Sequence, residues 1–345
     1  MRDIPAPLRR LLKQVSRSFF LSIAVLPGSL RRPIGVAYLL ARAADTVADT
    51  RIVPRPDRLR ILDGLRQELD ALAGSSAPDL TGALTGSQSP AERALLLRLD
   101  EVFAAFAELL PGDRRGVRDV VQRLIQGMQT DLTTFPGETE AELAALEARA
   151  DLDRYTYFAA GCVGEFWTEM TMVHRPACRA WDGDLRGRQG RRFGQALQMT
   201  NVLRDLAQDL RIGRCYVPRQ ELLAHGLRPA DLLHPGSLER FRPLLADLLR
   251  LTLTYYAEAW DYIAALPGTE VRMRLACLLP VFIGLATLDR IACARGLLDP
   301  AVHVKIPRST VRGILLRSVA TLGNGSALSG YHRGLRAAVE RALGP

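Results

Sequence analysis

The stretch VAYLLARAADTVAD, residues 36–49, places two acids four positions apart in a frame of alanine, leucine and valine. On an α-helix, residues four apart lie on one face. Offsets of 0, 4, 7 and 11 put four side chains on a single stripe of a predicted helix: Tyr38, Arg42, Asp45 and Asp49. One acid pair at this spacing costs a helix about 0.2–0.5 kcal/mol, and a solvated helix face would explain it.

A second acid pair occurs in NVLRDLAQDLRIGRCYVP, residues 201–218. Three polar side chains follow one another at intervals of four, with two arginines close by: Asn201, Asp205, Asp209, Arg204 and Arg214. Gly213 predicts the end of this helix, because glycine readily adopts the left-handed conformation that follows a last helical turn. Two such pairs, each beside an arginine and each in an apolar frame, favour a shared role over a solvated face.

If both apolar frames face a core or a cavity, the four carboxylates point inward. Buried carboxylates without a partner are very costly, so they need a cation. Oxygen ligands favour Mg²⁺, for which Mn²⁺ can substitute, with water and substrate phosphates completing the shell. We therefore expect the metal ligands to be Asp45, Asp49, Asp205 and Asp209. The nearby arginines suit the remaining oxygens of a diphosphate.

Other classes of chemistry lack their motifs. The sequence contains no GxxxxGK[ST] loop, no GxGxxG fingerprint and no GxSxG elbow. Its five histidines show no zinc-binding spacing. What remains is the metal-assisted departure of diphosphate as a leaving group.

Apolar residues recur at intervals of three and four along almost the whole chain, which predicts an all-α protein. With no long linker, we expect one domain over residues 1–345, with a polar loop at 75–90. Residues 186–194, RGRQGRRFG, are expected to be a basic connection leading into a helix. The apolar run 275–288 is too short to span a bilayer and predicts a buried helix.

The net charge of +9 and pI near 9.7 favour anionic partners such as phosphates, acidic membranes or nucleic acid. Without a recognised motif or interleaved aromatic and basic residues, nucleic acid is the weakest of these, and we expect none to bind. The five scattered cysteines and the lack of an apolar signal core indicate a cytoplasmic protein. No feature fixes an oligomeric state.

Four segments together resemble the squalene/phytoene synthase family, in matching order and spacing: SRSFF (16–20), YLLARAADTVAD (38–49), YTYFAAGCVGEF (155–166) and NVLRDLAQDLRIGRCYVP (201–218). The resemblance implies the all-α fold of a class I isoprenoid synthase, or prenyltransferase, around a central hydrophobic cavity. It also implies a proton-handling role for Tyr155 and catalytic roles for the four aspartates. The implied substrate-binding residues are Ser16, Arg17, Ser18, Phe19, Tyr38, Arg42, Asn201, Arg204 and Arg214.

The implied reaction joins two farnesyl diphosphates head to head into presqualene diphosphate and then reduces that product to squalene with NADPH. Two segments resemble squalene synthases in particular: LACLLPVFIGLATL (275–288) and VKIPRS (304–309), the latter with Lys305 and Arg308 as cofactor-binding residues. Pro307 departs from the pattern, since squalene synthases often carry a basic residue there. The alternatives are a synthase that stops at presqualene diphosphate or makes phytoene or dehydrosqualene, and a non-catalytic scaffold. Because substrates with such long apolar chains reside in membranes, the resemblance also predicts peripheral contact with a membrane.

Overall fold

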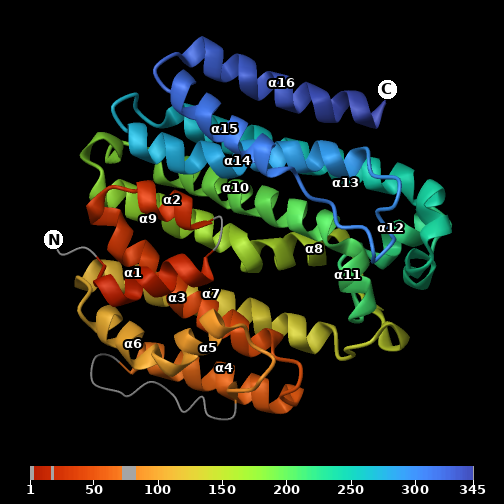
Figure 1. The fold of residues 1–345 in the computed structure, drawn as a ribbon, viewed down its shortest axis with the longest axis horizontal. Helices are drawn as coiled ribbons and strands as arrows, with labels where there is room; N and C mark the ends of the chain where they lie inside the picture. The colour runs from red at the N-terminus through yellow and green to blue at the C-terminus, as the bar shows by residue number, and fades with distance from the viewer. Residues whose placement is uncertain (1–3, 17–18, 72–82, 345) are drawn as a thin grey trace. The chain divides into compact units, whose positions relative to one another are not determined.

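The computed structural model describes residues 4–16, 19–71 and 83–344, and these are almost entirely helical (Figure 1). The all-α prediction is confirmed. The chain divides into two compact units, Met1–Thr133 with Glu165–Gly183, and Thr134–Gly164 with Asp184–Pro345. The chain passes from one unit to the other three times, after residues 133, 164 and 183, so each unit combines segments that are distant in the sequence. One domain for the whole chain stays a prediction.

Unit 1 is built from helices. Its helices are α1 (Ala6–Val15), α2 (Phe19–Val25), α3 (Gly28–Asp49), α4 (Arg55–Asp70), α5 (Pro90–Leu97), α6 (Leu99–Ala107), most of α7 (Pro111–Thr134) and most of α9 (Cys162–His174), with a short 3₁₀ turn, η4 (Pro176–Cys178). Helix α3 is central because it contacts α1, α2, α4, α5 and α6.

The end of α3 is fixed from inside the protein. Arg58 on α4 is 1% exposed, and its Nη1 donates to the carbonyl oxygen of Ala48 at 2.8 Å. The last carbonyls of a helix have no partner within it, so this buried guanidinium supplies one. The turn of α3 that carries Asp49 is thereby anchored to α4.

Unit 2 contains α13, which at 28 residues is the longest helix of the described residues. Its elements are η2 (Glu140–Glu142), β1 (Ala144–Ala145), α8 (Arg149–Thr156), the π-helical turn η3 (Tyr157–Gly161), α10 (Gly183–Arg204), α11 (Leu206–Arg211), β2 (Arg214–Cys215), α12 (Arg219–Ala224), η5 (Pro229–Leu233), η6 (Pro235–Ser237), α13 (Leu238–Ala265), α14 (Val271–Ala292), α15 (Arg308–Thr321) and α16 (Gly325–Leu343). The two short strands pair in parallel, with Ala144 opposite Arg214.

The apolar run at 275–288 lies in α14, as predicted, and α14 packs against α13, α15 and α16. Within the described part of the chain, α14 is the helix whose length and composition would suffice to cross a membrane. About two thirds of its apolar window, 67%, is buried inside the protein. This burial is typical of the core helix of a folded unit.

The prediction for residues 186–194 was wrong, because this basic segment lies inside α10. Gly194 of this segment permits a close contact instead of breaking the helix. A Cβ on Gly194 would lie 2.1 Å from the carbonyl oxygen of Ala160, and one on Gly164 would lie 1.7 Å from that of Gly190. Side chains at these positions would force the backbones apart.

The predicted loop at 75–90 lies partly outside the described residues. Residues 84–89 are irregular or turns, as predicted, and α5 begins at Pro90.

Candidate active site

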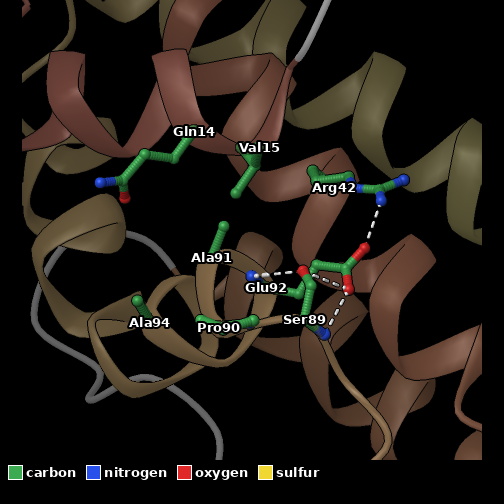
Figure 2. Close-up of a pocket in the computed structure, with 8 residues that line it drawn as sticks. All are labelled: Gln14, Val15, Arg42, Ser89, Pro90, Ala91, Glu92 and Ala94. Atoms are coloured by element: carbon green, nitrogen blue, oxygen red, sulfur yellow. Dashed lines mark hydrogen bonds and ion pairs between the residues drawn. The ribbon is translucent and has the colours of Figure 1, made fainter.

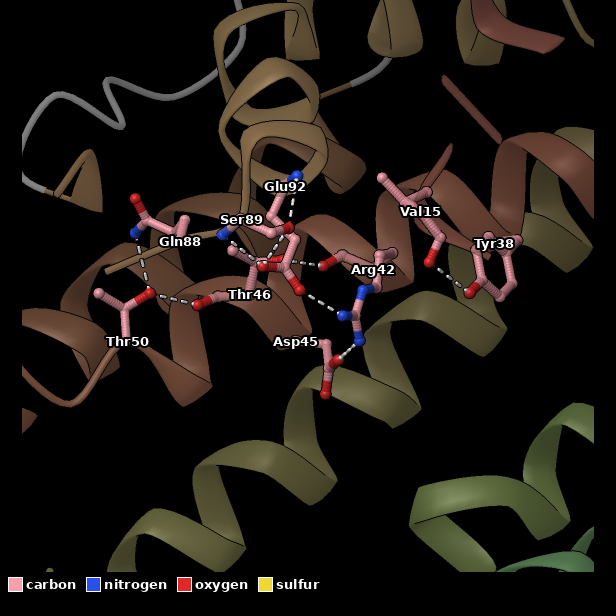
Figure 3. A network of polar contacts seen from close by, with 9 residues as sticks. All are labelled: Val15, Tyr38, Arg42, Asp45, Thr46, Thr50, Gln88, Ser89 and Glu92. Carbon is pink, nitrogen blue, oxygen red and sulfur yellow. Dashed lines mark hydrogen bonds and ion pairs between the residues drawn. The ribbon is translucent and has the colours of Figure 1, made fainter. Parts of the chain in front are cut away.

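The first acid pair lies on α3, on the stripe that the sequence predicted. Figure 3 shows Tyr38, Arg42 and Asp45 of this stripe. Arg42 Nη1 donates to Asp45 Oδ2 at 2.5 Å, and Arg42 Nη2 donates to Glu92 Oε1. The side chain of Asp45 is 38% exposed, and Asp49 at the end of the helix is exposed. Both aspartates are therefore accessible to solvent, Asp45 in part and Asp49 more fully.

The surroundings of Asp45 disfavour its charge. Burial raises the pKa of Asp45 to about 7, and the nearby charge of Asp49 raises it further, while Arg42 opposes both. A divalent cation bound to both carboxylates would reverse this balance, since it neutralises the repulsion that now favours the proton.

The donor set fits Mg²⁺. Each motif offers two carboxylates, and no group of three or more His, Cys, Asp or Glu side chains placed to hold a metal occurs among the described residues. Mg²⁺ is commonly held by one or two carboxylates plus water and substrate phosphates, so two carboxylates suffice.

Next to this pair stand other predicted substrate-binding residues. The hydroxyl of Tyr38 donates to the carbonyl oxygen of Val15 at 3.4 Å, which links α3 to the end of α1. Ser16 is buried, and its hydroxyl donates to the carbonyl oxygen of Leu12. Arg17 and Ser18 lie outside the described residues, and Phe19 is described only as the first backbone residue of α2.

The second acid pair spans the junction of α10 and α11. The backbone N–H of Asp205 donates to Asn201 at 2.8 Å, and that of Asp209 donates to Asp205 at 3.0 Å. Helical hydrogen bonds therefore occur on both sides of Asp205, although Asp205 itself departs from helical dihedrals, with φ −96° and ψ 8°. Arg204 holds Asp205 by two hydrogen bonds, at 2.8 Å from Nε and 2.5 Å from Nη2.

The predicted helix stop is confirmed. Gly213 has a φ of +81° and follows α11 after one residue. A Cβ at this position would also lie 2.9 Å from the carbonyl oxygen of Thr139. The turn leads directly into β2, where Arg214 is fixed by pairing with β1. This turn places Arg214 on the same segment as the second acid pair.

Tyr155 is tied to the second acid motif by an amide that sequence reasoning missed. Gln198 Nε2 donates to the Tyr155 hydroxyl at 3.0 Å, and Asn201 Nδ2 donates to Gln198 Oε1 at 3.3 Å. The Tyr155 ring stacks on Tyr216 with centroids 4.2 Å apart. Gln198 lies one helical turn before Asn201 on α10, so the i, i+3 spacing was the available signal.

A second network braces the turn that carries Tyr155. Asp153 Oδ1 accepts from Arg192 at 2.7 Å, from Gln195 at 3.1 Å and from the Tyr255 hydroxyl at 3.1 Å. The guanidinium of Arg192 also lies over the Tyr255 ring, 4.5 Å from its centroid. Helices α8, α10 and α13 are thereby joined two residues from Tyr155.

The predicted cofactor residues lie on the segment leading into α15. Lys305 is exposed in the connection, and Arg308 is the exposed first residue of α15. Gln208 on α11 contacts this connection, through the carbonyl oxygen of Pro300 at 3.4 Å and Nδ1 of His303 at 3.1 Å. The connection therefore lies against the helix that carries Asp209.

The two acid pairs belong to different units: Asp45 and Asp49 to the first, Asp205 and Asp209 to the second. That they face each other across a hydrophobic cavity stays a prediction. Within each unit, an acid pair on a helix with an arginine bound to one of its aspartates is now observed.

Comparison with known proteins gives this arrangement its context. The family model for squalene/phytoene synthase matches residues 12–310. The chain belongs to this family. The match includes both acid motifs, Tyr155 and Gln198, and the segment with Lys305 and Arg308.

Two curated relatives show the range within the family. A bifunctional lycopene cyclase/phytoene synthase of Arthroderma gypseum is 30% identical over 270 residues, 75% of this chain and 42% of that protein. A squalene synthase of Eremothecium gossypii is 26% identical over 330 residues, 95% of this chain and 70% of that protein. The chain thus spans about two fifths of the bifunctional relative and most of the squalene synthase.

Solved structures agree on the fold. The complex of TcSQS with the ligand E5700 is 22% identical, with 97% of both chains covered and a TM-score of 0.76. A dehydrosqualene synthase in complex with a ligand is 21% identical, with 92% of this chain and 95% of that chain covered and a TM-score of 0.63. The predicted squalene synthase-type isoprenoid synthase fold is confirmed.

Proposed function

We propose that the protein condenses two farnesyl diphosphates head to head into presqualene diphosphate and then reduces this to squalene. The observation that carries the proposal is the pair of helical acid motifs, each with an arginine bonded to its first aspartate, in a chain of this family. The alternative is a synthase of the same family without the reductive step, making presqualene diphosphate, dehydrosqualene or phytoene.

The acid motifs are suited to handling a leaving diphosphate. Asp45, Asp49, Asp205 and Asp209 would hold Mg²⁺, which supplies compensation for the negative charge that develops on the leaving group. Arg42 and Arg204 each keep further N–H donors besides those bonded to the aspartates, and a guanidinium matches phosphate oxygens well.

Tyr155 is suited to moving a proton. Donation from Gln198 Nε2 fixes the position of the phenol oxygen, and stacking on Tyr216 fixes the ring. A phenol of ordinary acidity takes up a proton only if a stronger base receives its own, and the departing diphosphate is such a base. We propose that the Tyr155 hydroxyl relays the proton lost on ring closure to the diphosphate.

We propose NADPH as the reductant, whose nicotinamide supplies a hydride when bound. Lys305 and Arg308 offer exposed positive charges suited to its phosphates. The bonds from Gln208 keep this segment beside α11, which carries Asp209. A cofactor that reduces a prenyl intermediate has to bind near the diphosphate site, and this segment lies near α11.

Product analysis tests the proposal. Purified protein is incubated with farnesyl diphosphate and Mg²⁺, with and without NADPH, and the extract is examined by mass spectrometry. Squalene formed only with NADPH is the expected result. Presqualene diphosphate or dehydrosqualene as the end product in both reactions would establish the alternative, and no condensation product at all would refute both.

We further propose a cytoplasmic location with peripheral membrane contact through α15. Arg312, Leu316 and Val319 follow at intervals of four and three, so they share one face. Leu316 is 72% exposed and Val319 is 56% exposed. Helix α15 contains three arginines and no acid, which suits an anionic lipid surface.

A further inference from the structure

Glu92 on α5 contacts the first acid motif although it lies about 50 residues further along the chain. One of its carboxylate oxygens caps the start of its own helix. Glu92 Oε2 accepts from the backbone N–H of Ser89 at 2.9 Å and from its hydroxyl at 2.7 Å, while Ser89 Oγ accepts from the Glu92 N–H at 3.3 Å. This capping box fixes the carboxylate by local bonds.

The other carboxylate oxygen of Glu92 contacts α3. Glu92 Oε1 accepts from Arg42 Nη2, while Arg42 Nη1 donates to Asp45 at 2.5 Å (Figure 3). The guanidinium is thus held between two carboxylates, one from its own helix and one from α5. A planar guanidinium bound at two of its nitrogens has little rotational freedom left.

The start of α5 is itself anchored to α3. Gln88 Nε2 donates to the Thr50 hydroxyl at 3.0 Å, and this hydroxyl donates to the carbonyl oxygen of Thr46 at 2.6 Å. The backbone N–H of Thr85 donates to Gln88 Oε1 at 2.9 Å, which fixes the amide. Gln88, four residues before Glu92, therefore ties the segment that precedes α5 to α3 (Figure 3).

The pair is reachable from outside. Arg42 and Glu92 line a pocket of about 620 Å³ whose other walls come from α1 and α5 (Figure 2). The side chains of Arg42 and Glu92 are 27% and 20% exposed. A capping box needs no arginine, so capping alone leaves the cross-helix bond unexplained. The bond acts on the one arginine of the first acid motif.

We propose that Glu92 is a positioning residue that holds Arg42 beside Asp45, ready to bind a diphosphate. This inference rests on the proposed function, because it concerns the group that the first motif binds. A donor fixed before its ligand arrives loses less freedom on binding than a mobile one. Mg²⁺ bound to the diphosphate offsets part of its negative charge, which weakens the repulsion from Glu92, so we expect the placement of Arg42 to outweigh that repulsion.

The test uses inorganic pyrophosphate in the presence of Mg²⁺, with binding to the full-length protein measured by calorimetry. Glu92→Gln keeps the capping box, since glutamine also serves at this position, but removes the charge that holds Arg42. Ser89→Ala removes the capping hydroxyl and leaves the bond that Arg42 donates to Glu92. Melting temperatures of all variants report on folding.

We expect Glu92→Gln to weaken pyrophosphate binding about tenfold and Ser89→Ala to change it less than about twofold. In an Arg42→Ala background, Glu92→Gln is expected to cause no further weakening. Unchanged binding in Glu92→Gln, an equal loss in Ser89→Ala, or an equal further loss without Arg42 would each overturn the inference. If the wild-type protein binds no pyrophosphate with Mg²⁺, the proposed function falls together with it.

Discussion

Asp45→Asn is expected to stabilise the metal-free protein most at about pH 8, less than half as much at about pH 5, and not at all below about pH 4. Burial first, and the charge of Asp49 second, raise the pKa of Asp45 from 3.8 to about 7. A folded state that holds a proton more tightly than the unfolded chain loses stability as the pH rises between the two pKa values. For Asp45 this loss begins near pH 4 and is complete above about pH 7, and asparagine avoids it.

The magnitude follows from the pKa and the exposure. A pKa change of roughly three corresponds to about 4 kcal/mol for an enclosed group. Because 38% of the Asp45 side chain is exposed, water screens the effect, and we expect about 1–2 kcal/mol. With an unfolding entropy of about 2.1 cal/mol/K per residue over 345 residues, this is about 1.5–3 °C in Tm.

The assay is thermal unfolding in EDTA, followed by circular dichroism at several pH values. Glu239→Gln is the control, because this carboxylate is 78% exposed and pairs only across one helical turn with Arg242. Its Tm is expected to differ from wild type by a constant amount. A gain from Asp45→Asn that is absent at pH 8, or equally large at pH 5, would refute the reasoning.

Three further outcomes are expected. Gly194→Ala is expected to lower the free energy of unfolding by about 2–3 kcal/mol or more in urea titrations, because its Cβ would meet a backbone carbonyl at 2.1 Å. Gly313→Ala, with nothing within 4 Å, is expected to be neutral or stabilising. Tyr155→Phe is expected to reduce turnover of farnesyl diphosphate at least about 100-fold with the fold retained, and near wild-type turnover would contradict the proton relay. Leu316→Gln is expected to weaken sedimentation with anionic vesicles, whereas Ile52→Gln, at an equally exposed site (71%), is expected not to.

Local periodicity explains why the helices and both acid stripes could be predicted. The stripe on α3 follows from offsets of 0, 4, 7 and 11, which any regular helix turns into one face. The end of the second motif was also predictable, because Gly213 needs a positive φ that other residues rarely adopt.

The glycines of residues 186–194 were misinterpreted because only the local sequence was considered. In residues 186–194, glycine and arginine together are typical of a connection, since glycine weakens an isolated helix by about 1 kcal/mol. The structure instead uses Gly194, together with Gly164 on the facing segment, to let α10 approach the backbone of residues 160–164. The neighbour that makes glycine necessary lies about 30 residues away, so no local pattern announces it.

Some partners of the site residues could be predicted from sequence spacing, and others could not. Gln198 stands one helical turn before Asn201, so its place beside the second motif could have been found from spacing alone. Its bond to Tyr155 could not, because that tyrosine lies on another helix. Glu92 was missed altogether, since its contact with Arg42 depends on how α5 packs against α3.

The sequence by itself determined that this is a helical protein with two acid-bearing helix faces, because helical periodicity is a property of neighbours in the chain. Only the tertiary structure decided that Arg42 is shared between two carboxylates, that Tyr155 is bonded to the second motif, and that the pKa of Asp45 is raised. These properties depend on which distant groups approach and how much water they displace, and packing sets both.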